Sequence, residues 1–244
     1  MGKAGPSWGA PKPSVAPRCS RCFQGAARDQ KFCGACGTPL PRRCERKHVT
    51  VLVSDVSGFT AMSERLDPED VRDILDRAFA IILDTVHAQG GTVNQFLGDG
   101  VMALFEEAPG HDDHATRGLR TALAIESRLA PLRSEVMRAH RVAFRVRIGL
   151  HTGPVVMGMI GAGLRSDYVP QGETTAVAAR LVAIARPGDV LASDRTLEHA
   201  EGAFLARDAG AITGDLESEP QRAYVVSGEL RERVDAEAGL LVEM

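Results

Sequence analysis

The chain has 244 residues and a formal net charge of −3, with hydrophobic residues making up 44% of it. This length allows one sizeable domain with an appendage, and the slightly acidic balance excludes a general nucleic-acid coat protein, which would be basic. No apolar run approaches the roughly 18 residues that a membrane helix needs. Residues 1–18 are rich in Gly, Pro and Ser and lack the apolar run of a secretory signal. We therefore expect a flexible tail on a cytoplasmic protein that binds neither nucleic acid nor a membrane.

Four cysteines follow this tail as two C-x2-C pairs that are separated by ten residues: Cys19, Cys22, Cys33 and Cys36. Each pair can direct two thiolates to one tetrahedral ion, and a reducing compartment favours zinc over two disulfides. Residues 19–40 are too short to build a core, so the metal would supply the folding energy. The segment is similar to a zinc ribbon. Four thiolates leave zinc no open position, which predicts a structural Zn²⁺ and a role in docking a protein partner, while Cys44 stays unassigned.

Residues 48–60, HVTVLVSDVSGFT, begin as a buried strand, because β-branched residues alternate along them. The strand ends at Asp55 and is followed by a turn, Ser57-Gly58-Phe59-Thr60, that leads into a helix. A carboxylate in this position can hold a hard cation over a phosphate whose oxygens accept from the N–H groups of the turn. An Asp that merely caps the helix is the alternative, and the stretch alone leaves both open.

A helix is predicted from Pro68 to the pair Gly90-Gly91, with Asp67 as its N-cap and one continuous apolar face. Two strand-like runs, Thr92–Phe96 and Val101–Phe105, follow and are joined by a Gly-Asp-Gly turn. The pattern predicts a hairpin that presents Asp99. Asp-Gly turns often serve backbone conformation only, so the hairpin alone does not make Asp99 a ligand.

The remaining elements are predicted in chain order: a helix over 111–137, strands over Phe144–Leu150 and Val155–Ile160 joined by a turn at residues 151–154, a helix over Glu173–Ala185, strands over 189–192 and 223–226, and a charged tail over 229–244. His111 and His114 begin the first of these helices, and we expect them to be solvated because no further ligand is near in sequence. The order predicts an α+β domain over residues 45–228, a ferredoxin-like mixed sheet with helices packed on one side.

Three segments together resemble the class III nucleotidyl cyclase domain, the catalytic domain of adenylate and guanylate cyclases. VTVLVSDVSGFT resembles its first strand and metal-binding turn, NQFLGDGVMALF its hairpin, and VRIGLHTGPVVMGMIG its central strand pair. The later DYVPQGETTAVAARL resembles the segment that faces the substrate in the partner subunit. The resemblance covers about residues 47 to 228.

The resemblance implies a lyase that converts a purine nucleoside triphosphate to the 3′,5′-cyclic nucleotide and pyrophosphate at a homodimer interface. ATP is the commoner substrate in the family, and the sequence leaves the choice between ATP and GTP open. Asp55, Asp99 and the backbone carbonyl of Val56 would hold two Mg²⁺ or Mn²⁺ ions. The turn Ser57, Gly58, Phe59 and Thr60 would receive phosphate oxygens, as would Arg147. Arg180 would stabilise the transition state from the other subunit. Without the resemblance, both arginines are ordinary exposed residues.

The residues that would face the base depart from the family pattern. Gln95 stands where the family often has Lys, Val169 where it has Asp or Thr, and Ala176 where it usually has Asn. The metal half of the site is thus kept and the base-facing half is altered. Two hypotheses remain: an active cyclase, paired with itself or with another cyclase-like domain, or a weakened module that binds nucleotide and metal and serves in regulation or partner docking.

Overall fold

The computed structural model describes residues 22, 24–25, 30, 32–38, 45–107, 113–160, 167–212 and 221–230. For residues 45, 158–160 and 167–169 only the backbone is described. The expected N-terminal tail, Cys19, Cys44, His111 and nearly all of the expected C-terminal tail lie outside these ranges. Within the described ranges, none of the helices combines the length and apolar character required to cross a bilayer.

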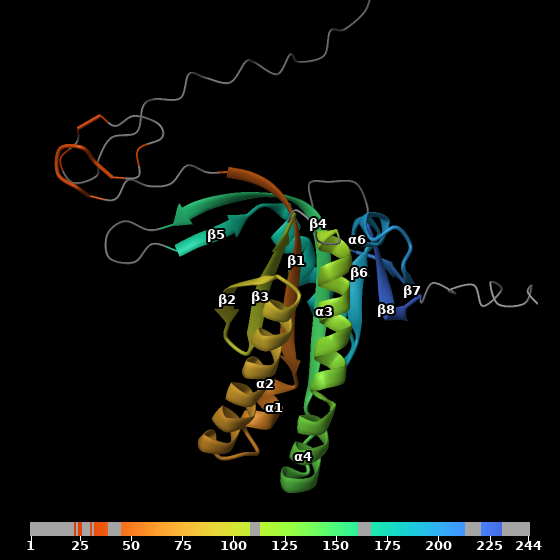
Figure 1. Cartoon of the computed structure of the whole chain (residues 1–244). Helices are drawn as coiled ribbons and strands as arrows, with labels where there is room; N and C mark the ends of the chain where they lie inside the picture. Colours follow the sequence, from red (N-terminus) through yellow and green to blue (C-terminus); the bar gives the residue numbers. More distant parts are fainter. Residues whose placement is uncertain are drawn as a thin grey trace, which may run out of the picture.

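The described part forms one mixed sheet with helices packed against it (Figure 1). The strands are β1 (Glu45–Ser57), β2 (Thr92–Leu97), β3 (Gly100–Glu106), β4 (Arg145–Ile160), β5 (Asp167–Gln171), β6 (Val190–Ser193), β7 (Phe204–Ala211) and β8 (Arg222–Glu229). The helices are α1 (Phe59–Ser63), α2 (Pro68–Ala88), α3 (His114–Arg128), α4 (Ala130–His140), α5 (Glu173–Ile184) and α6 (Asp194–His199). The sheet order is β2-β3-β1-β4-β6-β8-β7, with β5 pairing β4. The β4–β6 pair is parallel and the others are antiparallel, which confirms the predicted α+β class.

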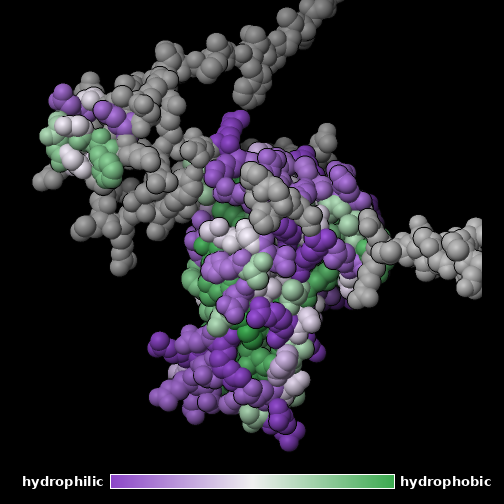
Figure 2. All heavy atoms as spheres, in the orientation of Figure 1, coloured by the Kyte–Doolittle hydropathy of each residue, from purple (hydrophilic) through white to green (hydrophobic). Residues whose placement is uncertain are grey.

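Helices cover both faces of the sheet, so the expectation of helices on one side only is wrong. The helices α2, α3 and α4 pack on one face, and a Cβ at Gly118 of α3 would lie 3.1 Å from the Thr50 methyl group of β1. The helix α5 packs on the opposite face, where a Cβ at Gly149 would lie 2.6 Å from the Ala178 carbonyl oxygen. In Figure 2 the exposed surface of α2 is mostly hydrophilic, and apolar atoms appear where α2 meets α4.

The strand β4 runs without a break through residues 151–154, so the predicted turn there is wrong. Thr152 and His151 pair with Thr50 and Val51 of β1. Pro154 is opposite His48 in the β1–β4 ladder, and on the other edge of β4 it lies between the stretches that pair with β6 (148–150) and with β5 (156–160), where the described strands offer it no partner. Gly153 is required by packing, because a Cβ there would lie 2.8 Å from the Thr174 hydroxyl oxygen of α5.

Two further differences have local causes. The helix predicted over 111–137 divides at Leu129, because Pro131 in the first turn of α4 cannot continue the hydrogen-bond ladder of α3. The strand β7 was missed because it lies at the sheet edge and is mostly exposed, so its sequence shows no apolar alternation. The short elements α6 and β5 were also not predicted, whereas α1 begins at the turn that is expected to lead into a helix.

His114 is buried, with 3% of its surface exposed, so the expectation that it is solvated is wrong. Its Nδ1 lies 2.7 Å from the Thr50 hydroxyl oxygen in a hydrogen bond. The first turn of α3 packs directly over β1, and this contact between residues distant in sequence removes the side chain from solvent.

Candidate active site

Asp55 lies near the end of β1, between the two strands that flank it. It pairs with Gly100 of β3 on one side and with Arg147 of β4 on the other. A Cβ at Gly100 would collide with the Ser54 carbonyl oxygen, so only glycine lets the hairpin turn approach β1 this closely. The preceding residue, Asp99, is therefore placed beside Asp55.

The two carboxylates interact electrostatically. Burial raises the pKa of Asp99 above its ordinary value, and the negative charge of Asp55 raises it further. The Arg147 guanidinium acts in the opposite direction on Asp99, and its Nη2 donates a hydrogen bond to Asp55 Oδ2. Asp55 and Arg147 are both about one quarter exposed, so this cluster is open to a ligand at one side.

Two polar atoms beside this cluster have no partner. In the described part of the chain, Ser57 Oγ and Arg147 Nε are buried without a hydrogen bond. A buried polar atom without a partner costs about 1–3 kcal/mol, and a ligand bound beside the carboxylates could satisfy both of these atoms. Gly58 follows with φ of 75° and begins α1, whose first N–H groups have no carbonyl partner within the helix.

These groups fit divalent cations and phosphate. Asp55 and Asp99 supply the hard oxygen ligands that Mg²⁺ and Mn²⁺ prefer, and the orphaned donors suit phosphate oxygens. The structure thus brings together the predicted residues Asp55, Asp99, Arg147 and the turn 57–60, while their roles stay predictions. The side chain of Val56 is buried in the core, which leaves only its backbone for the site.

Sequence reasoning missed the direct contact between Asp55 and Arg147. Arg147 was assigned to phosphates only. The contact follows from the register of β1 against β4, in which the two residues are directly opposite. Neither strand's sequence specifies that register, so no local signal was available to find it.

The base-facing candidates lie on other elements. Gln95 follows a β-bulge in β2 and donates to the Met102 sulfur at 3.9 Å, on the same face of the sheet as Asp55. Ala176 and Arg180 are exposed and lie one turn apart on α5. The backbone of Val169 in β5 pairs with Gly158, and its side chain lies outside the described part.

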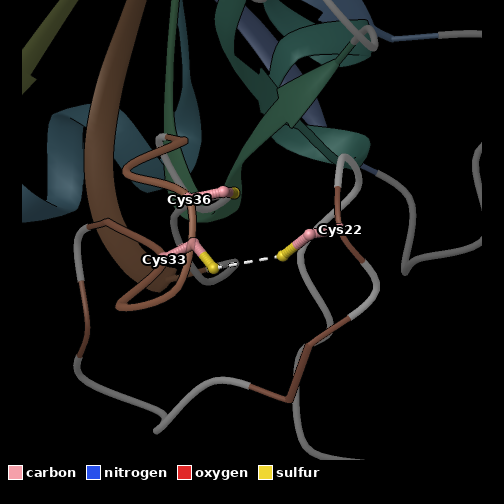
Figure 3. A group of neighbouring side chains, drawn as sticks. All are labelled: Cys22, Cys33 and Cys36. Atoms are coloured by element: carbon pink, nitrogen blue, oxygen red, sulfur yellow. Dashed lines mark hydrogen bonds between the residues drawn. The ribbon is translucent and has the colours of Figure 1, made fainter.

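Three of the four predicted zinc ligands gather near the N-terminus. The sulfurs of Cys22, Cys33 and Cys36 all lie within 4.8 Å of one another, and Figure 3 shows them on two facing segments. The Cys22 and Cys33 sulfurs are 3.5 Å apart, and all three cysteines are free thiols. A tight turn holds the second pair, because the Gly37 N–H donates to the Cys33 carbonyl. Cys19, the fourth predicted ligand, lies outside the described residues.

Comparison with known sequences points to one family. A family model described as the adenylate and guanylate cyclase catalytic domain matches residues 43–228. Adenylate cyclase 1 of Rhizobium meliloti (strain 1021) is 34% identical over 200 residues, which cover 81% of this chain and 30% of that protein. An uncharacterized protein of Mycobacterium bovis is 36% identical over 166 residues, covering 67% of this chain and 28% of that protein. The chain thus spans less than a third of the length of these relatives.

Solved structures agree with the sequence comparison. The adenylyl cyclase CyaB from P. aeruginosa superposes with a TM-score of 0.70 at 29% identity, covering 79% of this chain and 99% of that chain. The guanylyl cyclase Cya2 superposes with a TM-score of 0.71 at 29% identity, covering 79% and 98%. The resemblance drawn from the sequence motifs is confirmed, and the chain belongs to the class III adenylate and guanylate cyclase family, with residues 43–228 as its catalytic domain.

Proposed function

We propose that this chain cyclises ATP to 3′,5′-cyclic AMP and pyrophosphate at a site shared between two copies. The observation that carries the proposal is the pair Asp55 and Asp99 at adjoining strand ends, beside Ser57 Oγ and Arg147 Nε, which have no hydrogen-bond partner among the described residues. We favour ATP over GTP because the curated relative at 34% identity is an adenylate cyclase. The structural neighbours include both kinds of cyclase.

The reaction asks the protein for positioning and charge neutralisation. The ribose 3′-oxygen loses its proton and attacks the α-phosphorus, and the bond from this phosphorus to the bridging oxygen of pyrophosphate breaks. Two Mg²⁺ or Mn²⁺ ions, when bound, supply activation of the 3′-oxygen and neutralise phosphate charge. Asp55 and Asp99 would hold them, with the Val56 carbonyl. Arg147 would turn from Asp55 toward the phosphates and could then also donate from Nε, which is buried without a hydrogen bond in the described part of the chain.

The resemblance to the cyclase family implies that a second copy completes the site. Arg180 is exposed on α5, whereas the carboxylates lie at the end of β1 and in the turn between β2 and β3. An arginine that acts on the transition state contributes about 10²–10³-fold in rate, as other preorganised donors do. We therefore propose a homodimer in which Arg180 of one copy serves the carboxylate pair of the other. In an alternative arrangement, this chain pairs with the cyclase-like domain of another protein instead of with a second copy of itself.

The first experiment measures cyclic nucleotide formation from ATP and from GTP, with Mg²⁺ and with Mn²⁺. We expect cyclic AMP from the wild type and only background from Asp55→Ala or Asp99→Ala. Asp76→Ala is the matched control, because Asp76 is an exposed carboxylate of α2 that pairs only with its helical neighbour Arg72 among the ion pairs described. Absence of product from either nucleotide, from a protein verified as a dimer, would refute the activity.

The second experiment tests whether the site is shared. Asp55→Ala chains mixed with Arg180→Ala chains form mixed dimers with one intact site each. Random exchange should restore about a quarter of the wild-type sites. Mixed dimers that form and yet recover no activity would rule out the shared site while leaving the family assignment intact.

A weakened module is the second candidate, and Ala176 favours it. This residue lies on the exposed face of α5 one turn before Arg180, where a methyl group cannot hydrogen-bond a ribose. A module of this kind would bind Mn²⁺ and a non-cyclisable ATP analogue and release no product from ATP. Calorimetric binding measured together with the product assay separates the two functions.

The cysteine cluster supports a proposed structural Zn²⁺. Three thiols within 4.8 Å supply three of four tetrahedral ligands, and Cys19 would be the fourth. Closed thiolate coordination suits docking of a protein partner rather than catalysis. Free thiols this close together also favour a reducing compartment such as the cytoplasm.

A further inference from the structure

Three imidazole rings gather where β1 enters the sheet. His48 comes from β1, His114 from the start of α3, and His199 from the end of α6. The ring centroids are 4.9 Å apart for His48 and His199, 5.6 Å for His48 and His114, and 5.8 Å for His114 and His199. His48 is roughly 23 Å along β1 from Asp55, so the cluster is remote from the carboxylate pair.

The spacing of the rings matches a shared tetrahedral ion. Zinc lies 2.0–2.1 Å from an imidazole nitrogen, which places the centroids of two coordinated rings about 5.2 Å apart. The observed separations bracket this value. Among the described residues, only the cysteine cluster has three ligand atoms within 4.8 Å of one another, so the nitrogens of the three histidines do not converge in the present rotamers and the rings must rotate to bind one ion. His48 and His199 are exposed and have room to rotate.

His114 is the anchored member of the cluster. It is buried, and its Nδ1 is hydrogen-bonded to the Thr50 hydroxyl oxygen, which lies 2.8 Å from the Thr152 hydroxyl oxygen. When Nδ1–H donates to Thr50, and Thr50 donates to Thr152, Nε2 is left with its lone pair available. Metal-binding histidines generally have this kind of partner on the other ring nitrogen, because it fixes the tautomer and the ring orientation.

The electrostatics of the cluster favour a cation bound to neutral rings. Burial lowers the pKa of His114 and of His48, and the neighbouring histidines lower both further. Burial therefore favours the neutral form of His48 and of His114, and the neutral imidazole is the form that coordinates metal. The carboxylates of Asp113 and Glu107 oppose this shift at both rings, and they would balance the charge of a bound ion, while Arg195 faces His48 with the opposite sign.

We propose that His48, His114 and His199 form a binding site for a divalent transition-metal ion of the zinc class, separate from the cysteine cluster and the carboxylate pair. Three imidazoles leave the fourth tetrahedral position to water. The ion would join β1, α3 and α6 and so stabilise the folded domain by an amount that grows with the logarithm of the free ion concentration above its Kd. The site does not depend on the proposed cyclase activity.

The test compares zinc binding by full-length variants in the presence of excess Mg²⁺, which occupies hard oxygen sites. His48→Gln and His199→Gln change exposed residues and leave buried His114 in place. His87→Gln is the matched control, because His87 is exposed in the last turn of α2. Each protein is dialysed against buffered zinc, and bound zinc is counted by mass spectrometry.

We expect the wild type and His87→Gln to bind one more equivalent of zinc than His48→Gln or His199→Gln. Any zinc that still binds at the histidine site of His48→Gln or His199→Gln should bind at least about tenfold more weakly than in the wild type. The cysteine cluster contributes equally to all four proteins, so the difference isolates the histidine site. Equal stoichiometry and equal affinity across the four proteins would overturn the proposal.

A second measurement identifies the ligands directly. Zinc should shift the imidazole nitrogen NMR signals of all three histidines in the wild type and leave that of His87 in place. It should also raise the melting temperature of the wild type more than that of His48→Gln, because this variant cannot close the site. Unshifted signals for the three rings at saturating zinc would exclude coordination even if the stoichiometry differed.

Discussion

Arg147 Nη2 donates a hydrogen bond to Asp55 Oδ2 across a directly opposed pair of residues on β4 and β1. The contact joins the residue proposed to bind phosphate to the residue proposed to bind metal. The guanidinium therefore competes with a divalent cation for the same carboxylate. Its second donor, Nε, is buried without a partner among the described residues.

Arg147→Gln separates these two effects. Removing the positive charge beside Asp55 should strengthen Mn²⁺ binding to the nucleotide-free protein. The same change should lower the rate of cyclisation about 10²–10³-fold, because the phosphates lose a charged donor. Calorimetric titration with Mn²⁺ and a product assay measure the two quantities. Unchanged turnover would show that Arg147 does not act on the phosphates.

Ala176→Asn should raise the turnover. The side chain is exposed on α5, so a larger polar residue fits without repacking, and its amide could orient the ribose from the partner copy. Ala179→Asn is the control, because Ala179 is also exposed on α5 and carries the same cost of placing Asn in a helix, about 0.5 kcal/mol. A higher kcat in Ala176→Asn but not in Ala179→Asn supports the shared site. Equal kcat values in the two variants contradict it.

Gly149→Ala should damage activity through the position of α5. A Cβ at this point of β4 would lie 2.6 Å from the Ala178 carbonyl oxygen and 2.9 Å from both the Leu181 Cβ and the Val182 nitrogen. Backbone atoms of a helix cannot yield locally, so α5 must shift, at a cost of about 1–3 kcal/mol in folding free energy. Urea unfolding and the product assay measure both consequences.

Gly228→Ala is the matched control for this effect. Its new Cβ would meet only the Leu205 side chain at 3.8 Å, which is ordinary contact. We expect its stability and activity to stay near the wild-type values. A Gly149→Ala protein with the same properties as this control would mean that α5 is not packed as the structure describes.

Acidification should destabilise the fold through His151. This residue is 2% exposed, its Nδ1 lies 2.7 Å from the Ser193 hydroxyl oxygen, and burial lowers its pKa from 6.5 to about 4. Between pH 6.5 and pH 4, His151 is therefore protonated in the unfolded chain and neutral in the folded chain. Stability falls as the pH falls through this window, by up to about 3 kcal/mol.

Urea unfolding at pH 7.5, 6 and 5 measures this dependence. His151→Gln should be less stable at pH 7.5 and should lose part of the slope, whereas His87→Gln, changed at an exposed position, should keep the wild-type slope. A slope that is identical in His151→Gln and the wild type would assign the pH dependence to other groups.

Cys33→Ser should remove the proposed structural zinc and spare the catalytic domain. Cys33 is 3% exposed and contacts the Cys22 sulfur, so its loss breaks the cluster. We expect one equivalent less of bound zinc and an almost unchanged circular-dichroism spectrum, because the sheet and its helices lie outside this segment. A collapse of the whole spectrum would show that the cluster supports the domain fold.

Local patterns determined much of this protein from sequence alone. The alternation of valines predicts β1, the apolar face and the cap predict α2, and the Gly-Asp-Gly turn predicts the β2–β3 hairpin, all of which are present. Family motifs on these elements named Asp55 and Asp99 as candidates. These signals are readable because periodicity and turn chemistry act between residues that are near in sequence.

The tertiary structure alone decided how these elements meet. The register of β1 places Asp55 opposite both Gly100 and Arg147, and a one-residue shift would reverse every side chain of the strand. The passage of β4 through Pro154, the position of α5 on the second face and the burial of His114 likewise depend on neighbours far away in the chain. Packing between distant segments sets these features, and no local pattern encodes it.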